Sequence, residues 1–173
     1  SGAERIVAHQ NALDRLTGSD VPDIAKPTDT YRTETVRLHR YVNGEGIEVI
    51  HLPNAHTDGD SAVWFRSSNV ISAGAVFNTD SYPVLDVARG GSVQGEIDAL
   101  VRLANLAYPE FFSQGGTMIV PGHGRLSDRA DIAYYRDMVI VVRDRIQSMI
   151  RKGMTLQQVK AAKPTVDFDP LYG

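Results

Sequence analysis

The stretch HTDGDSAVWF, residues 56–65, joins a short polar loop to an apolar strand and decides how the rest of the chain is interpreted. Its first five residues hold a histidine and two aspartates, and residues 61–65 are rich in Val, Trp and Phe, which favour strands. Residues 47–52, just before it, also have a strand pattern. His56 is therefore expected on a loop that directly follows a strand, a common position for binding and catalytic groups.

A second histidine has the same kind of setting. His123 stands in VPGHG, residues 120–124, directly after a short apolar run over residues 117–120. Glycine beside it lets the backbone turn sharply, and imidazole is a common ligand for zinc, copper, iron and nickel. Two histidines are fewer than the three protein ligands of a catalytic zinc, so spacing alone is a weak indication of a metal site. For the other histidines, His9, His39 and His51, we expect surface or hydrogen-bonding roles.

The remaining patterns predict an α/β fold in which a mixed sheet is covered by helices. A hairpin is expected from residues 34–41 and 47–52 around the turn at 43–46, with further strands at 61–65, 70–73 and 117–120. Apolar spacing predicts a helix after an N-cap at Ser92 and a longer one over residues 131–152. The other expected elements are a strand at 5–8, a helix at 11–16, a loop at 17–30, a short helix to residue 162 and an irregular tail at 163–173.

Composition excludes several classes of protein. The 173 residues suit one domain, and 18 basic against 21 acidic residues show no basic excess, so no nucleic-acid partner is expected. There is no cysteine, which rules out disulfides and cysteine-based zinc sites. No apolar run approaches the roughly 20 residues that span a bilayer, and the first residues lack a signal-peptide pattern. We expect no membrane partner, and the compartment stays open.

Three segments together resemble the metallo-β-lactamase superfamily. Residues 56–65 resemble its third metal-binding motif, in which a histidine is followed by Thr-x-Gly-Asp and a strand. Residues 70–77, VISAGAVF, resemble the next motif, a strand ending in Gly-Asp, and residues 120–124 resemble the last, a strand ending in Gly-His-Gly. The motifs occur in the family's order, and the resemblance covers roughly residues 5–150. Three short motifs in order are fairly specific, although each is weak alone.

The resemblance implies a fold, a cofactor and a reaction class. The complete family fold is an αβ/βα sandwich that binds one or two zinc ions and hydrolyses lactams, lactones, thioesters or phosphoesters with metal-activated water. By resemblance, His56 would bind the first metal and His123 the second. Asp60 matches the aspartate of Thr-x-Gly-Asp, for which we expect a structural role or a role in orienting a metal ligand. The substrate would be a small molecule with an ester or amide type of bond.

Two departures from the family pattern limit these expectations. The His-x-His-x-Asp-His motif that supplies the first metal ligands is absent. We therefore expect residues 1–173 to form a single incomplete domain that lacks the N-terminal half of the fold. The position of the bridging aspartate is occupied by Ala75, whose methyl group cannot bind a metal. The chain alone is thus predicted to hold no stable zinc centre and to be inactive.

Three hypotheses stay open at this point. The chain is the C-terminal part of a hydrolase, or a degenerate, non-catalytic member that serves binding or assembly, or an unrelated α/β binding domain with two chance histidine motifs. Half a sandwich would leave a sheet face or edge uncovered, so we expect a homo-oligomer or a complementary N-terminal fragment as partner.

Overall fold

The centre of the molecule is a five-stranded mixed sheet with the strand order β3-β4-β5-β6-β7. The computed structural model describes residues 5–38, 43–111 and 115–173. The strands are β3 (Thr35–Arg37), β4 (Ile47–Leu52), β5 (Asp60–Phe65), β6 (Val70–Asn78) and β7 (Met118–His123). Neighbouring strands are antiparallel except β6 and β7, which are parallel. The predicted hairpin is confirmed over residues 35–37, which pair with β4, whereas residues 39–41 of its first strand lie outside the described residues.

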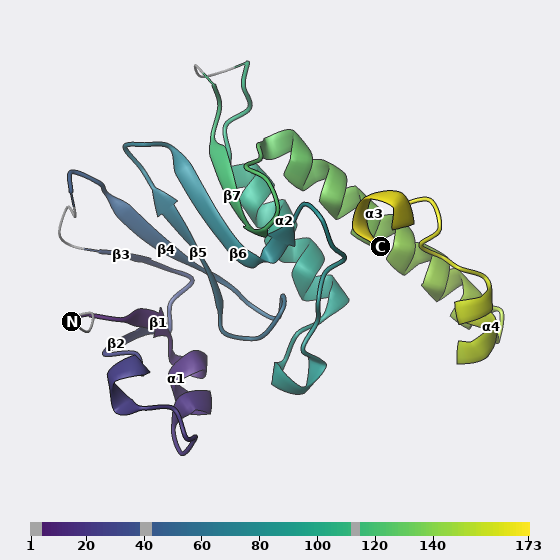
Figure 1. The fold of residues 1–173 in the computed structure, drawn as a ribbon, viewed down its shortest axis with the longest axis horizontal. Helices are drawn as coiled ribbons and strands as arrows, with labels where there is room; N and C mark the ends of the chain where they lie inside the picture. The colour runs from purple at the N-terminus through teal and green to yellow at the C-terminus, as the bar shows by residue number, and fades with distance from the viewer. Residues whose placement is uncertain (1–4, 39–42, 112–114) are drawn as a thin grey trace.

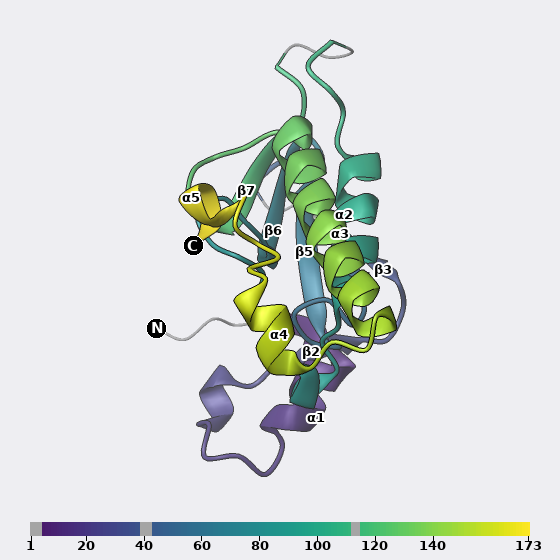
Figure 2. The same ribbon diagram turned by 90° about the vertical axis from the view of Figure 1, so that its right-hand side faces the viewer.

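Two long helices cover one face of this sheet (Figures 1 and 2). They are α2 (Val93–Leu106), which connects β6 to β7, and α3 (Arg129–Arg151). Ser92 Oγ accepts a hydrogen bond from Gly95 N at 2.9 Å, as predicted for the N-cap of α2. The α3 helix begins with a capping box between Asp128 and Asp131. The predicted α/β class, a mixed sheet covered by helices, is confirmed.

The hydrophobic core lies between the sheet and the two helices. Alternate strand residues point into it. The largest buried side chains come from the sheet and from both helices: Ile50, Leu52, Ile71, Phe77, Leu100, Leu103, Ile119, Ile132, Tyr135 and Met138. The aromatic rings of Phe77 and Tyr135 meet edge to face with centroids 5.4 Å apart. This burial, worth about 1.5–3 kcal/mol per large side chain, stabilises the layered arrangement.

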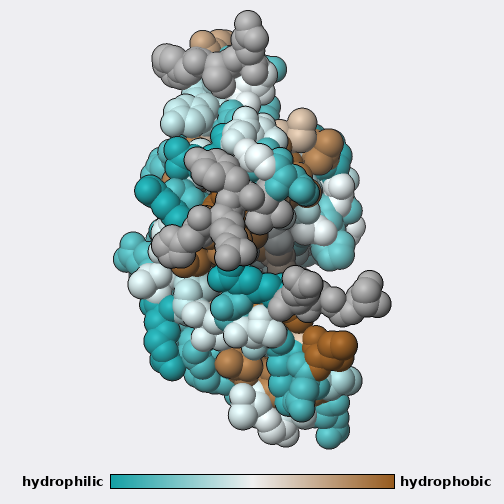
Figure 3. Space-filling model, turned by 90° about the vertical axis from the view of Figure 1, so that its left-hand side faces the viewer, coloured by the Kyte–Doolittle hydropathy of each residue, from teal (hydrophilic) through white to brown (hydrophobic). Residues whose placement is uncertain are grey.

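The opposite face of the sheet is also apolar, and it has no helix of the described chain upon it (Figure 1). The strand registers place eight apolar side chains on this face: Val36, Ile47, Val49, Val63, Phe65, Val70, Met118 and Val120. Most are half-buried, and Met118 is 47% exposed. Figure 3 views the molecule from this side. We call this set the open face.

Both ends of the chain add small elements that the sequence patterns only partly predict. The N-terminal segment, residues 5–31, contains β1 (Val7–His9), α1 (Gln10–Leu16), the 3₁₀ helix η1 (Asp23–Ala25) and β2 (Asp29–Tyr31). β1 and β2 pair in parallel as a separate two-stranded sheet, so the prediction of a plain loop over residues 17–30 is wrong at its end. Among the described residues, no helix is long and apolar enough to cross a membrane.

The sequence predicted an irregular C-terminal tail, and this prediction is wrong. The tail folds back onto the core. After α4 (Leu156–Ala161) the chain ends in α5 (Asp169–Tyr172). The Tyr172 ring is 9% exposed and packs against the Tyr135 and Tyr82 rings, with centroids 5.4 and 5.8 Å apart. Tyr82 also donates a hydrogen bond to Asp169 Oδ1 at 2.7 Å. The order of the tail comes from these long-range aromatic contacts, which leave no periodic pattern in the sequence.

The two faces of α2 provide a test of where the core lies. Leu100 is fully buried, whereas its neighbour Val101 is 37% exposed. Leu100→Ala should lower the free energy of unfolding by about 2–5 kcal/mol, because it leaves a cavity under the sheet. Val101→Ala, the matched control, should change it by less than about 1 kcal/mol. Urea denaturation followed by circular dichroism measures both, and equal effects would contradict this assignment of the core.

Candidate functional site

The strand directions place both candidate ligands along one edge of the sheet. β4, β6 and β7 run in the same direction, since β5 is antiparallel to both β4 and β6 and β7 is parallel to β6. Their C-terminal ends therefore lie at the same edge. His56 follows β4 in the loop of residues 53–59, and His123 is the last residue of β7. Sequence reasoning expected His123 just after its strand.

The His56 imidazole is held in one orientation by the backbone. Its Nδ1 lies 2.5 Å from the carbonyl oxygen of Val84. A carbonyl only accepts, so Nδ1 carries the proton and Nε2 keeps its lone pair. Metal-binding histidines commonly have their second ring nitrogen fixed by a carbonyl in this way. Half-buried His56 thus has the tautomer that a metal ligand requires.

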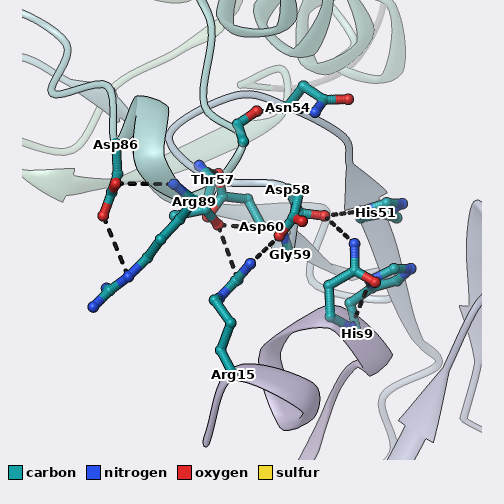
Figure 4. A network of polar contacts seen from close by, with 12 residues as sticks. His9, Arg15, His51, Asn54, Thr57, Asp58, Gly59, Asp60, Asp86 and Arg89 are labelled. Carbon is teal, nitrogen blue, oxygen red and sulfur yellow. Dashed lines mark hydrogen bonds and ion pairs between the residues drawn. The ribbon is translucent and has the colours of Figure 1, made fainter.

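The loop of residues 53–59 is fixed by its contact with the beginning of α2. A Cβ on Gly91 would lie 2.1 Å from His56 O, and one on Gly95 would lie 1.9 Å from Asn54 O, so only glycine fits at either position. Ser92 N donates to Asn54 O at 2.9 Å, and Asp86 N donates to His56 O at 2.9 Å. Asp86 precedes the 3₁₀ helix η2 (Val87–Arg89), and Figure 4 shows both beside the loop.

Asp60 closes the same loop from its other end. Its Oδ2 accepts a hydrogen bond from Thr57 N at 2.6 Å, and its Oδ1 accepts one from Thr57 Oγ1 at 3.0 Å. Both carboxylate oxygens are thus engaged by Thr57, the residue that follows His56 in the sequence; Figure 4 shows Thr57 and Asp60. This geometry suits the structural role that the sequence comparison suggested.

His123 and Ala75 lie on the paired strands β6 and β7. His123 is exposed and pairs with Asn78, and its carbonyl accepts a hydrogen bond from Thr79 N at 3.1 Å. Ala75 is exposed and follows Gly74, which has a φ of +59° where the register of β6 shifts against β7. The exposed methyl group of Ala75 presents no donor atom at this point of the edge.

Several solved structures have the same arrangement of elements. A metallo-β-lactamase from Pontibacter korlensis matches with a TM-score of 0.57 and 14% identity over 79% of this chain and 58% of its own. The DIM-1 metallo-β-lactamase matches with a TM-score of 0.58 and 17% identity over 78% of this chain and 56% of its own. The chain has the C-terminal portion of the metallo-β-lactamase fold. At the level of sequence, neither a protein-family model nor a curated protein matches.

The metallo-β-lactamase fold also accommodates other hydrolytic enzymes. The stereoselective inverting sec-alkylsulfatase Pisa1 from Pseudomonas sp. matches with a TM-score of 0.58 and 16% identity over 78% of this chain and 21% of its own. The chain spans 58% and 56% of the two lactamases, which is little more than half of each. The likeness therefore concerns the fold, and the chemistry of this chain has to be argued from its own residues.

His56 and His123 are of a residue type that suits a zinc ion, but two ligands are too few to hold one. His56 and His123 offer imidazole nitrogens, which zinc prefers, and His56 has its lone pair on Nε2. Within residues 5–38, 43–111 and 115–173, however, no group of three or more His, Asp or Glu side chains could hold a metal ion. A complete zinc centre thus needs ligands beyond those that this part of the chain brings together.

The site region contains a polar network that the sequence reasoning missed. His9 was expected to have a surface or hydrogen-bonding role, but its ring stacks on His51, with centroids 3.7 Å apart. His51 Nε2 in turn lies 2.9 Å from Asp58 O, and Asp58 forms an ion pair with Arg15 (Figure 4). The two histidines are 42 positions apart in the sequence, so only the tertiary fold reveals the pair.

A second missed feature is the carboxyl group of Glu96. It stands in the first turns of α2, is fully buried, and has no hydrogen-bond partner on either oxygen within the described residues. Burial, assisted by the charge of Asp60, raises the pKa of Glu96 to about 8. The side chain is therefore protonated and neutral at pH 7. The burial of Glu96 was not predicted from the sequence.

Glu96 should make the protein less stable as the pH rises. Below pH 4.5 the carboxyl is protonated in both states, but between pH 4.5 and 8 it ionises only in the unfolded state. The free energy of unfolding should fall across that window, and Glu96→Gln should remove this fall. At pH 7 the variant should be more stable by on the order of 3 kcal/mol.

Urea denaturation at several pH values measures this effect. Asp98→Asn, on the exposed side of the same helix, is the control and should keep the wild-type pH profile. If Glu96→Gln had the same pH profile as the wild type, the buried, neutral state of Glu96 would be refuted.

Proposed function

We propose that this chain is the C-terminal part of a zinc-dependent hydrolase with the metallo-β-lactamase fold, in which His56 and His123 are metal ligands. The proposal rests chiefly on one observation: both imidazoles stand where strands end at the same sheet edge, and His56 has Nδ1 tied to Val84 O at 2.5 Å. The substrate would be a small lactam, lactone, thioester or phosphoester, cleaved by metal-activated water.

Because this chain has too few metal ligands, we assign activity to an assembled protein and not to this chain by itself. A catalytic zinc has three protein ligands and one open position. His56 and His123 provide two, and Ala75 provides none. The missing ligands would come from the N-terminal half of the fold, and residues 1–173 would be one incomplete domain. In that assembly, Asp60 and Val84 O would keep the loop and ring of His56 in place.

Zinc binding tests the ligand assignment. The chain alone should retain less than one tightly bound zinc ion after purification, measured by plasma mass spectrometry. In the complete protein, His56→Ala and His123→Ala should each lower zinc affinity by about ten-fold or more, because each removes a direct ligand. Asp60→Asn keeps the shape of the loop and should have the smaller effect. A full equivalent of tightly bound zinc on the isolated chain would overturn the requirement for an outside half.

A second candidate function follows from Ala75. A retained fold with a lost ligand suits a non-catalytic protein that serves binding or assembly. Ala75→Asp in the complete protein separates the two candidates. Increased zinc content together with new hydrolytic activity would favour the degenerate protein. Unchanged zinc content would be evidence against Ala75 as the reason for a lost metal site.

The open face indicates what a partner would cover. Its eight apolar side chains lie on a sheet whose other face is already packed against α2 and α3. Apolar faces of this kind mark interfaces. We propose that the open face packs against a second sheet, supplied by an N-terminal half or by a second copy of this chain, as in a two-layered sandwich.

Self-association of the chain tests this surface. We expect oligomers in analytical ultracentrifugation, and the double variant Val63→Ser/Phe65→Ser should weaken their formation about ten-fold or more by removing apolar contacts. Val141→Ser, at a 37% exposed position of α3, should leave the association unchanged. A chain that stays monomeric at its highest soluble concentration would contradict the homo-oligomer, and failure to bind an added N-terminal half would contradict the open face as an interface.

A further inference from the structure

Two buried imidazoles form the contact between the N-terminal segment and the main sheet. The rings of His9 and His51 are stacked, with centroids 3.7 Å apart and an interplanar angle of 7°. The Tyr31 ring packs edge-on against His9 at 5.3 Å. His9 is only 6% exposed, although no pattern in the sequence marks it as a core residue.

The hydrogen bonds of the pair require a neutral His9 and fix which nitrogen of His51 donates. His9 Nδ1 accepts from Asn11 N at 3.3 Å and thereby caps α1, so this nitrogen cannot carry a proton. His51 Nε2 donates to Asp58 O at 2.9 Å, which leaves its Nδ1 unprotonated in the neutral ring. A second proton on His9 would remove the cap of α1. A second proton on either ring would place a charge against the stacked neighbour.

The charged groups around the pair mostly oppose protonation. Burial, and then His51, lower the pKa of His9 below its usual value of 6.5. Arg32, which follows β2, and Arg15 on α1 act in the same direction, whereas Asp58 on the loop of residues 53–59 acts in the opposite one. Stability from such a group is complete above the unfolded-state pKa and is lost as the pH falls through the lower folded-state pKa.

The other polar attachments of the N-terminal segment converge on the same place. Asn11 Nδ2 donates to Asp58 O at 3.2 Å, and Arg15 pairs with the Asp58 carboxylate (Figure 4). Tyr31 OH and Ser61 Oγ share a hydrogen bond of 2.6 Å. β1 and β2 form their own two-stranded sheet and do not continue the main one. The imidazole stack thus stands at the centre of the attachment.

We propose that the stacked His9–His51 pair is a pH-sensitive latch, which holds residues 5–31 against the loop of residues 53–59 when His9 is neutral and releases them when His9 is protonated in acid. Protonation breaks the cap of α1 and introduces repulsion into the stack. The loop of residues 53–59, from which residues 5–31 would separate, also carries His56. The latch nevertheless rests only on the fold, and it stands whether or not His56 binds a metal.

Hydrogen–deuterium exchange on the complete chain tests the latch. After correction for intrinsic exchange, protection of residues 5–31 should fall about ten-fold between pH 7.5 and 5.5, while α3 keeps its protection. His9→Phe keeps a stacked ring that cannot be protonated, so its protection should no longer depend on pH in this range. His123→Gln, which changes an exposed histidine, should retain the wild-type response.

Imidazole titration by NMR provides an independent measurement on the unmodified chain. His9 should take up its proton below pH 6.5, and the α1 amide signals should shift at the same pH. Titration of His9 at 6.5 or above with no change in α1 would overturn the latch even if His9→Phe failed to fold. In the exchange experiment, an equal loss of protection in α3 would also overturn the latch, and so would a pH response that persists in His9→Phe.

Discussion

The contact between the beginning of α2 and the loop of residues 53–59 is the constraint on which the site depends. Backbone meets backbone there, because Gly91 and Gly95 have no Cβ and a Cβ at either position would overlap a carbonyl oxygen. The contact fixes the loop from one side while Asp60 closes it from the other. The orientation of His56 is therefore set by main-chain groups and by packing, which leaves its Nε2 available. A ligand positioned in this way is ordered before any metal arrives.

The same region contains ionisable groups that folding keeps neutral. Glu96 is buried with no hydrogen-bond partner in the part of the chain that the structure describes, and the His9–His51 stack is also buried. Their effects on stability have opposite signs: the carboxyl favours acidic conditions, and the imidazole pair favours neutral or alkaline ones. Burial of an ionisable group lowers stability unless the group is hydrogen-bonded or paired. The two imidazoles are hydrogen-bonded, so this cost falls mainly on Glu96.

The sheet has two apolar faces, and the chain spans little more than half of the lactamases that it matches. A sheet with helices on one face and polar groups on the other would be complete in itself. Here both faces are apolar, from Val49 in β4 to Val120 in β7. The solved lactamases are longer than the part that this chain matches. Under the proposal of an incomplete domain, a partner that covers the open face would also supply the remaining metal ligands.

Local sequence determined the elements and the place of the candidate ligands. Strand alternation in residues 61–65, the Ser92 cap and the apolar stripe of α3 depend on near neighbours, and they were predicted correctly. The expectation that His56 and His123 follow strands came from the same local patterns, as did the absence of a donor at Ala75. Their roles as ligands rest on the resemblance and are still proposals.

Only the tertiary structure decided the contacts between distant residues. His9 meets His51, Tyr172 packs on Tyr135, and Glu96 is buried under the sheet, because the packing of whole elements brings them there. A periodic pattern records which face of an element is apolar, but not which element will cover that face. For the same reason the sequence could mark His9 only as an ordinary histidine and the tail only as irregular. Long-range packing determines where His9 and the C-terminal tail lie.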